Sequence, residues 1–155
     1  MFIVQFVIFI VCFVPLSLII HELGHIVGAR LNKATNIKLT IGTGRIIFQK
    51  SCYYIKIVVR LILFIGISTA SHRTVRFSHN EKFFIALLGP VFSLLFALLL
   101  CLLYIFYINY DSLQLAYLFN FWLFIINMIP FRVGQKQSDG YTMYRMIKKN
   151  TKSNR

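Results

Sequence analysis

The first twenty residues carry no charged side chain and lead directly into the motif His-Glu-Leu-Gly-His at positions 21–25. Because an α-helix rises about 1.5 Å per residue, a segment of this length spans roughly 30 Å, the thickness of the hydrocarbon layer of a bilayer. A cleaved signal peptide is the competing interpretation, but the segment has neither a basic start nor a small-residue cleavage site. We therefore predict a membrane-spanning helix over about residues 2–27 that continues through the motif to residue 31.

Two later apolar segments predict two more membrane-spanning helices, over about residues 83–108 and 113–129. Only the short connection Asn-Tyr-Asp-Ser separates them, so these two helices should be antiparallel neighbours. Hydrophobic residues make up 58% of the 155-residue chain, a share that favours a polytopic membrane protein over a soluble domain. The predicted fold class is a single membrane all-α domain, residues 1–155, with a core of three transmembrane helices.

Between the first and second predicted helices the sequence favours strands. Residues 37–41 alternate apolar and polar side chains, and the Gly-Thr-Gly at 42–44 is a turn signal. We predict a small β-hairpin or sheet at the membrane surface over about residues 36–68. An extra membrane span over about residues 57–71 is the alternative, because much of this stretch is apolar.

Basic residues greatly outnumber acidic ones, with 17 Lys and Arg against 4 Asp and Glu. Ten of the basic residues fall in residues 30–82 and seven in residues 131–155, whereas the connection between the last two predicted spans contains only Asp111. Because cytoplasmic loops carry the excess of positive charge, we predict an N-terminus outside, which places the motif at 21–25 near the cytoplasmic side. The composition points to a bacterial plasma membrane, and the loop charges favour anionic lipid head groups over nucleic acid.

The motif at 21–25 has the spacing of a metal site. On a helix, His21 and His25 lie one turn apart on the same face, which suits two nitrogen ligands of a single Zn²⁺ ion. Glu22 is rotated away from both rings, where it can take a proton from water at the metal without being a ligand. The alternative is a set of ordinary polar residues at a membrane interface, although polar groups at the end of an apolar span are costly and usually functional.

Asp139 is the candidate third ligand. It is the only acidic residue after the third predicted span, in the loop and basic tail at 130–155, and Gly140 follows it. Two histidines and one aspartate would leave one zinc position for water, as catalytic zinc sites do. The competing interpretation makes Asp139 the N-cap of a short basic amphipathic helix that begins at Tyr141.

Together these residues resemble the site-2 protease family of intramembrane zinc metalloproteases. The residues that match its patterns are His21, Glu22 and His25 for the HExxH helix, Gly89, Pro90 and Ser93 for the Gly-Pro-x-x-(Asn/Ser) pattern of the central helix, and Asn127, Pro130, Asp139 and Gly140 for the Asn-x-x-Pro…Asp-Gly motif. Asn127 and Asp139 are twelve positions apart, which exceeds the usual family spacing. The loop between them is therefore expected to bulge.

The resemblance implies a zinc-dependent endopeptidase, with one zinc ion per chain, that hydrolyses peptide bonds of membrane-embedded or membrane-bound peptides and proteins. In that role Glu22 is the general base and Asp139 is the third zinc ligand. Asn127 would hydrogen-bond the substrate or the oxyanion, unless it only packs the end of its helix. Gly24 would permit close helix approach. A strand edge within residues 37–64 would hold an extended substrate by β-augmentation.

A second class of function is left open, a catalytically silent zinc-binding membrane protein with an immunity, chaperone or interaction role. The intact Glu22 favours the enzyme, because a structural zinc site needs no general base. The expected partners are membrane lipid and a membrane-bound peptide or single-span protein substrate, without nucleic acid. The sequence predicts no particular oligomeric state.

Overall fold

The computed structural model describes residues 1–107, 109–134 and 136–153. A long helix opens the fold, in which α1 (Phe2–Ile8), the π-helical η1 (Phe9–Phe13) and α2 (Val14–Leu31) follow one another without a break. Pro15 has no N–H to donate to the preceding turn, and the wider π turn lies directly before it. The helix predicted over residues 2–31 is therefore confirmed.

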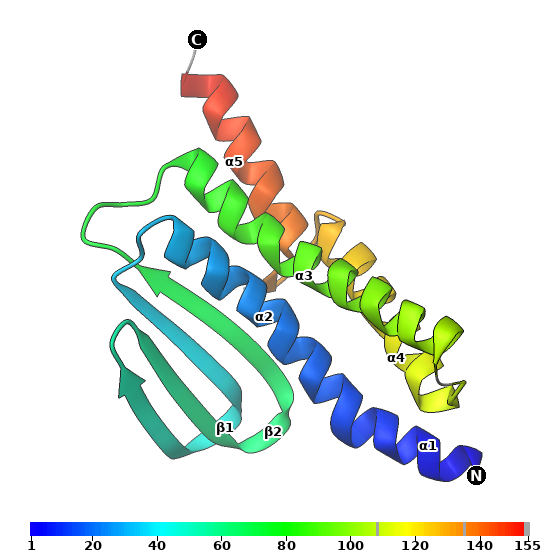
Figure 1. Cartoon of the computed structure of the whole chain (residues 1–155). Helices are drawn as coiled ribbons and strands as arrows, with labels where there is room; N and C mark the ends of the chain where they lie inside the picture. Colours follow the sequence, from blue (N-terminus) through cyan, green and yellow to red (C-terminus); the bar gives the residue numbers. More distant parts are fainter. Residues whose placement is uncertain (108, 135, 154–155) are drawn as a thin grey trace.

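Helices α3 (His79–Phe106) and α4 (Asp111–Met128) form an antiparallel pair (Figure 1). α3 begins four residues earlier than predicted, because Ser78 and Glu81 form a capping box. In it, the Ser78 hydroxyl accepts a hydrogen bond from the Glu81 N–H, and the Glu81 carboxylate accepts one from the Ser78 N–H. α4 ends just before Pro130, since the residue preceding a proline is restricted to an extended conformation.

Within the described residues, two helices are long and apolar enough to cross a membrane. They are Phe2–Leu31 and His79–Phe106, with mean hydropathies of 2.9 and 2.7 over their most apolar windows. Only 6% of that window is buried in the first helix, which leaves its apolar side chains available to lipid. α4 is not one of the two, because polar residues such as Gln114 and Asn120 interrupt its apolar sequence. The fold is thus mostly helical with a small sheet, and a core of three membrane-spanning helices stays a prediction.

The region after the first helix forms a sheet and not a further helix. β1 (Asn36–Cys52) and β2 (Ile55–His72) pair as an antiparallel hairpin. The alternative of a membrane span over residues 57–71 is therefore wrong. The predicted hairpin region is confirmed, although it extends to residue 72 and not to residue 68.

Each of the two long strands folds back on itself, so that together they supply four strand segments. Residues 36–41 pair in antiparallel register with residues 67–72, and their other side pairs with residues 55–59. Residues 55–59 in turn pair with residues 48–52, so that 67–72 and 48–52 form the two edges of the sheet. Three glycines with positive φ of 85°, 87° and 83° allow the bends, and these are Gly42, Gly44 and Gly66.

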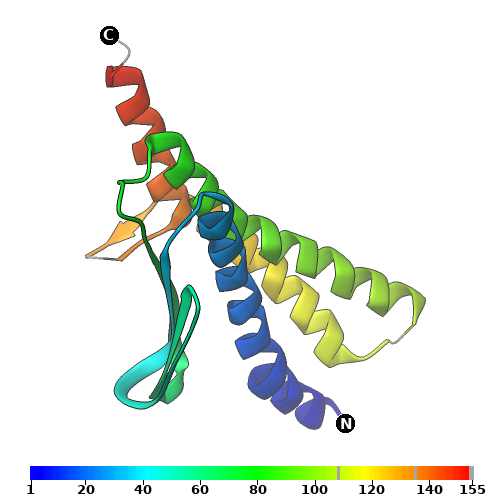
Figure 2. The same ribbon diagram turned by 60° about the vertical axis from the view of Figure 1, so that its left-hand side comes forward.

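α2 lies between α3 and the sheet (Figure 1). Its approach to α3 requires a residue without a side chain, because a Cβ added at Gly24 would overlap the carbonyl oxygen of Leu88. α2 also packs its buried Ile26 and Ala29 against Ile37 of β1. Figure 2 shows the sheet almost edge-on beside α2.

The chain after α4 returns to α3. It forms the short strands β3 (Arg132–Val133) and β4 (Lys136–Gln137) and then α5 (Asp139–Ser153). α5 lies beside the N-terminal part of α3, where the Asn150 amide donates a hydrogen bond to the Asn80 side chain. As a result the start of α5, with Asp139, lies against His21 and His25 of the long first helix.

Candidate metal centre

α2 presents two histidines toward α3. His21 and His25 lie one turn apart, with ring centroids 5.0 Å from each other. The Nδ1 atom of His21 lies 2.9 Å from the hydroxyl oxygen of Ser93, and Nδ1 of His25 lies 2.9 Å from the carbonyl oxygen of Ile85. Because a carbonyl can only accept, the second contact places the proton of neutral His25 on Nδ1. The Nε2 lone pair of His25 is then available to a metal, as in sites whose second ring nitrogen is held by an outer partner.

The small residues of α3 let its backbone reach these rings. A Cβ added at Gly89 would overlap the imidazole ring of His25. Pro90 and Ser93 are fully buried on the same helix. The pattern noted at positions 89, 90 and 93 therefore lies against the histidines, and Ser93 is the member that contacts one of them directly.

Hydrogen bonds of Ser138 fix the position of Asp139 beside the two histidines. Its hydroxyl donates to the carbonyl oxygen of Ile129 at 2.7 Å and accepts a hydrogen bond from the N–H of Tyr141 at 3.1 Å. Ser138 is thus the N-cap of α5, and the interpretation of Asp139 as a cap for a helix beginning at Tyr141 is wrong. Because Ser138 takes that task, the carboxylate of Asp139 is left to face the two imidazoles.

The long loop before Asp139 contains a short hairpin, formed by β3 and β4, which takes up the additional length between Asn127 and Asp139. Gly140 is required where this hairpin meets α4, because a Cβ there would overlap the carbonyl oxygen of Met128. Pro130 is exposed, and it keeps Ile129 extended with a ψ of 127°. Pro130 and Gly140 therefore shape the chain that positions Asp139.

The carboxylate oxygens of Asp139 each face one imidazole. Oδ2 lies 3.1 Å from Nε2 of His21, and Oδ1 lies 3.3 Å from Nε2 of His25. Ligand atoms around a tetrahedral zinc ion with bonds of about 2.0–2.1 Å are roughly 3.3 Å apart, which the two Asp139 distances match, and the three potential ligand atoms all lie within 4.8 Å of one another. Burial disfavours the charged form of Asp139, but hydrogen bonds from His21 and His25, when these rings carry a proton on Nε2, outweigh this and hold its pKa below the usual range.

A cavity of about 510 Å³ opens beside these three side chains. Glu22 lines it without belonging to the triad of potential ligands, as expected for a base. Asn127 lines it as well, and its amide donates one hydrogen bond to the carbonyl oxygen of Leu123 at 2.9 Å. This bond packs the side chain against the end of its own helix, and the amide nitrogen carries a second proton that the bond does not use.

The sheet supplies the wall opposite the helices. Residues 66–69, which begin the outer edge of β2, line the cavity together with Gly42 and Thr43 of β1. Lys136 and Gln137 of β4 complete the lining. The substrate-binding edge was expected within residues 37–64, but the free edge beside the site lies later in the chain. That position depends on strand register, which the sequence alone does not specify.

Comparison with known proteins agrees with this geometry. The model of peptidase family M50 matches residues 8–114, more than half of the chain. The matched range includes His21, Glu22 and His25 but ends before Asn127 and Asp139. A search among curated proteins gave no match. The chain belongs to peptidase family M50, the site-2 protease family of membrane metalloproteases.

Proposed function

We propose that this protein is an intramembrane zinc-dependent endopeptidase that cleaves membrane-embedded or membrane-bound peptides and proteins. The observation that carries the proposal is the convergence of His21, His25 and Asp139 in a cavity that Glu22 also lines. Two histidines and one carboxylate leave a zinc position open, which distinguishes catalytic from structural zinc sites. A zinc ion bound there would polarise the attacking water and the scissile carbonyl.

Glu22 performs the proton transfers. Its carboxylate accepts a proton from water as the water oxygen bonds to the carbonyl carbon of the substrate. It then returns this proton to the amine nitrogen as the carbon–nitrogen bond breaks, so that one water molecule is consumed for each peptide bond. The remaining amide proton of Asn127 is available to the oxyanion that develops on the substrate.

The edge of β2 holds the substrate. A transmembrane helix hydrogen-bonds its own backbone, so its scissile carbonyl is accessible only after the segment becomes extended. Residues 67–72 pair with β1 on one side, and the start of this edge lines the cavity. An extended substrate can add to this edge by β-augmentation and pass in front of His25 and Asp139.

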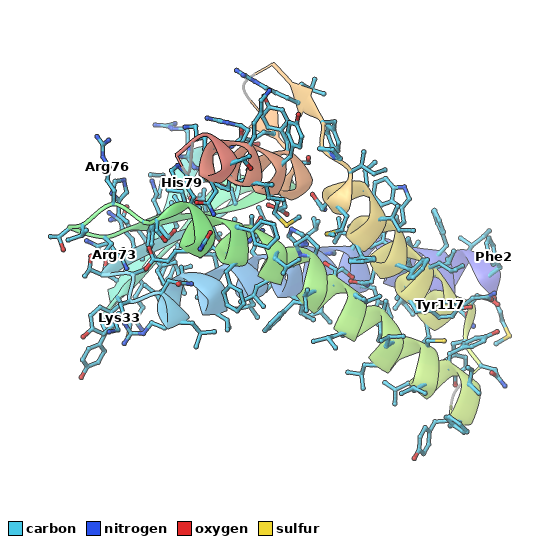
Figure 3. All side chains as sticks on the ribbon, turned by 90° about the horizontal axis from the view of Figure 1, so that it is seen from above. Phe2, Lys33, Arg73, Arg76, His79 and Tyr117 are labelled. Carbon is cyan, nitrogen blue, oxygen red and sulfur yellow. The ribbon has the colours of Figure 1, made fainter. Side chains whose placement is uncertain are left out.

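The charges of the fold support the predicted orientation in the membrane. In Figure 3, Lys33, Arg73 and Arg76 lie at one end of the molecule, and Phe2 and Tyr117 lie toward the other. The positive-inside rule would place the basic end in the cytoplasm and the N-terminus outside. The three potential zinc ligands then lie nearer the cytoplasmic face, because His21 follows almost thirty ångströms of helix, at about 1.5 Å per residue.

The proposal is tested by combining metal analysis with cleavage of a membrane-bound peptide. We expect the wild-type protein in nanodiscs to retain about one zinc ion and to cleave the peptide. Glu22→Gln should retain zinc and lose about 100-fold or more of the cleavage rate, because a positioned base contributes that much. His21→Ala should lose both zinc and cleavage, since it removes a ligand.

Two outcomes would contradict the proposal. Equal cleavage by wild type and Glu22→Gln would show that this carboxylate is not the base. Zinc binding by the wild-type protein without cleavage of any peptide in a broad library would instead indicate a catalytically silent zinc-binding membrane protein. The position of Glu22 in the lining of the cavity argues against that alternative.

A further inference from the structure

A second cavity, of about 260 Å³, leads away from the metal centre toward the start of α3. It shares His25, Asp139 and Thr69 with the larger cavity, so the two spaces meet at the potential zinc ligands. Its far end is lined by Ser71 of β2 and Lys82 of α3. This space therefore follows the free edge of β2 beyond the site of cleavage.

A third cavity, of about 320 Å³, continues in the same direction. It shares Ser71 and Lys82 with the second cavity and reaches His72 and Arg76. We call the second and third cavities together the basic trough. Because the trough runs beside residues 69–72, a peptide chain that adds to this strand edge would have its side chains in the trough.

The basic residues of the trough differ in their partners. The guanidinium of Arg73 binds the carboxylate of Glu81 through two hydrogen bonds, of 3.0 and 2.9 Å. Within the described residues, Lys82 and Arg76 form no such ion pair, and both are exposed in the trough. The trough therefore holds an excess of positive charge that a ligand can neutralise.

Thr69 adds a polar group between the metal centre and Lys82. Its hydroxyl oxygen is buried and has no hydrogen-bond partner among the described residues. Buried polar groups without a partner are uncommon in folded proteins, and such a group beside a cavity is explained by a ligand or a water molecule. The path from the metal centre to Lys82 is thus suited to a polar, extended chain.

We propose that the basic trough is a substrate subsite that binds a carboxylate, held by Lys82 with support from Arg76. This inference rests on the proposed endopeptidase function and names a class of substrate for it. The preferred peptide carries a carboxylate on the side of the scissile bond that points toward the start of α3. The carboxylate belongs to an Asp or Glu side chain or to the end of the substrate chain.

The strand edge limits where the carboxylate lies. Thr69 lines both cavities with His25 and Asp139, whereas Ser71, two residues further along the strand, lines the trough with Lys82. An extended chain advances about 3.3 Å per residue, so a substrate beside this edge advances at the same rate. Lys82 therefore meets the second or third residue from the scissile bond, and a carboxylate at the first residue would fall short of the ammonium group.

Binding of peptide hydroxamates tests the inference without relying on catalysis. The hydroxamate anchors one end of the peptide at zinc, so the register is known. Two fluorescent series, with the hydroxamate at either chain end, would carry Glu, Gln or Lys at each of the next four positions. Anisotropy would be measured on zinc-loaded, full-length Glu22→Gln protein in zwitterionic nanodiscs, where the lipid supplies no net negative charge.

In one of the two series, we expect Glu at the second or third position to bind about three- to tenfold more tightly than Gln. Lys82→Glu should reverse this order, so that Lys at the same position binds best. Arg76→Glu should weaken the preference for Glu. Lys149→Glu is the matched control and should change nothing, because Lys149 is an exposed lysine of α5 outside the trough.

Peptides that end at the preferred position, with a free or an amidated terminus, identify the source of the carboxylate. Tighter binding of the free form means that the trough also accepts a chain end. Equal binding of both forms restricts the subsite to acidic side chains.

Equal binding of Glu and Gln peptides at every position, or an unchanged preference in both Lys82→Glu and Arg76→Glu, would overturn the inference. If Glu22-dependent cleavage is nevertheless observed, the endopeptidase proposal stands and only the subsite is wrong. Charge-dependent binding without Glu22-dependent cleavage would support the carboxylate-binding trough and contradict the endopeptidase proposal.

Discussion

At the scale of single residues, Gly89 is in close contact with the candidate metal centre. It lies on α3 directly against His25, and any side chain there would enter the space of the imidazole ring. The ring is the mobile end of a side chain, so it can move aside more easily than backbone can. We therefore expect Gly89→Ala to displace His25 without unfolding the helix pair.

The predicted result for Gly89→Ala is at least a tenfold loss of zinc affinity, similar to the loss caused by altering outer partners of metal ligands. Zinc affinity would be measured by competition with a chromophoric chelator. The melting temperature of the zinc-free protein should change little. Gly24→Ala is the comparison, because its Cβ would meet the backbone of Leu88, which cannot move aside, and should lower that melting temperature. Wild-type zinc affinity in Gly89→Ala would contradict the structure.

At the scale of elements, the outer edge of β2 is the proposed binding site for the extended substrate. In an antiparallel strand, successive N–H groups point alternately toward the partner strand and away from it. A proline scan through Ser68, Thr69 and Ala70 should therefore give two kinds of variant. Where the lost N–H faces β1, the melting temperature should fall, because a bond of the sheet is lost.

Where the lost N–H faces outward, we expect cleavage to fall about three- to tenfold with little change in melting temperature, since one hydrogen bond to the substrate is lost. The same scan at Gln49 and Lys50, on the opposite edge, is the control and should leave cleavage unchanged. Unaltered cleavage throughout Ser68, Thr69 and Ala70 would show that the substrate does not pair with this edge.

At the scale of the whole molecule, the uneven charge distribution predicts the orientation in the membrane. Asp111 begins α4 at the end with few basic residues, whereas Asn150 lies on α5 at the basic end. Single cysteines would be introduced at these two positions after replacement of Cys12, Cys52 and Cys101. A membrane-impermeant maleimide should label Asp111→Cys in intact cells and Asn150→Cys only after permeabilisation, and the reverse pattern would exclude this orientation.

The features that the sequence predicted correctly are local. The spacing of His21 and His25 places both rings on one helix face in any α-helix, whatever surrounds it. The twenty-residue apolar segment likewise depends only on neighbouring residues. The Ser78–Glu81 capping box is equally local, but the prediction of a helix from residue 83 did not use it. The histidine spacing and the apolar segment predicted the first helix and two of the three potential zinc ligands. The family resemblance, which the match over residues 8–114 confirms, rests partly on the same residues.

Residues 57–71 form a segment whose secondary structure is not determined by local sequence signals. This apolar stretch is compatible with a strand or a membrane helix, because a continuous apolar run has no decisive period. The choice depends on whether another strand is available to pair with its backbone, and β1 supplies that strand. The same pairing decides that the edge beside the cavity is 67–72, which no property of that segment alone indicates.

The sequence by itself determined a long apolar helix with two histidines and a glutamate at one end of its apolar span, because helix geometry is local. Only the tertiary structure decided that Asp139, 118 positions after His21, completes the group of potential ligands. That contact requires the β3–β4 hairpin, the cap supplied by Ser138 and the close approach of α3 at Gly89. Each of these is a contact between segments far apart in the chain, and such contacts form only when the whole domain packs.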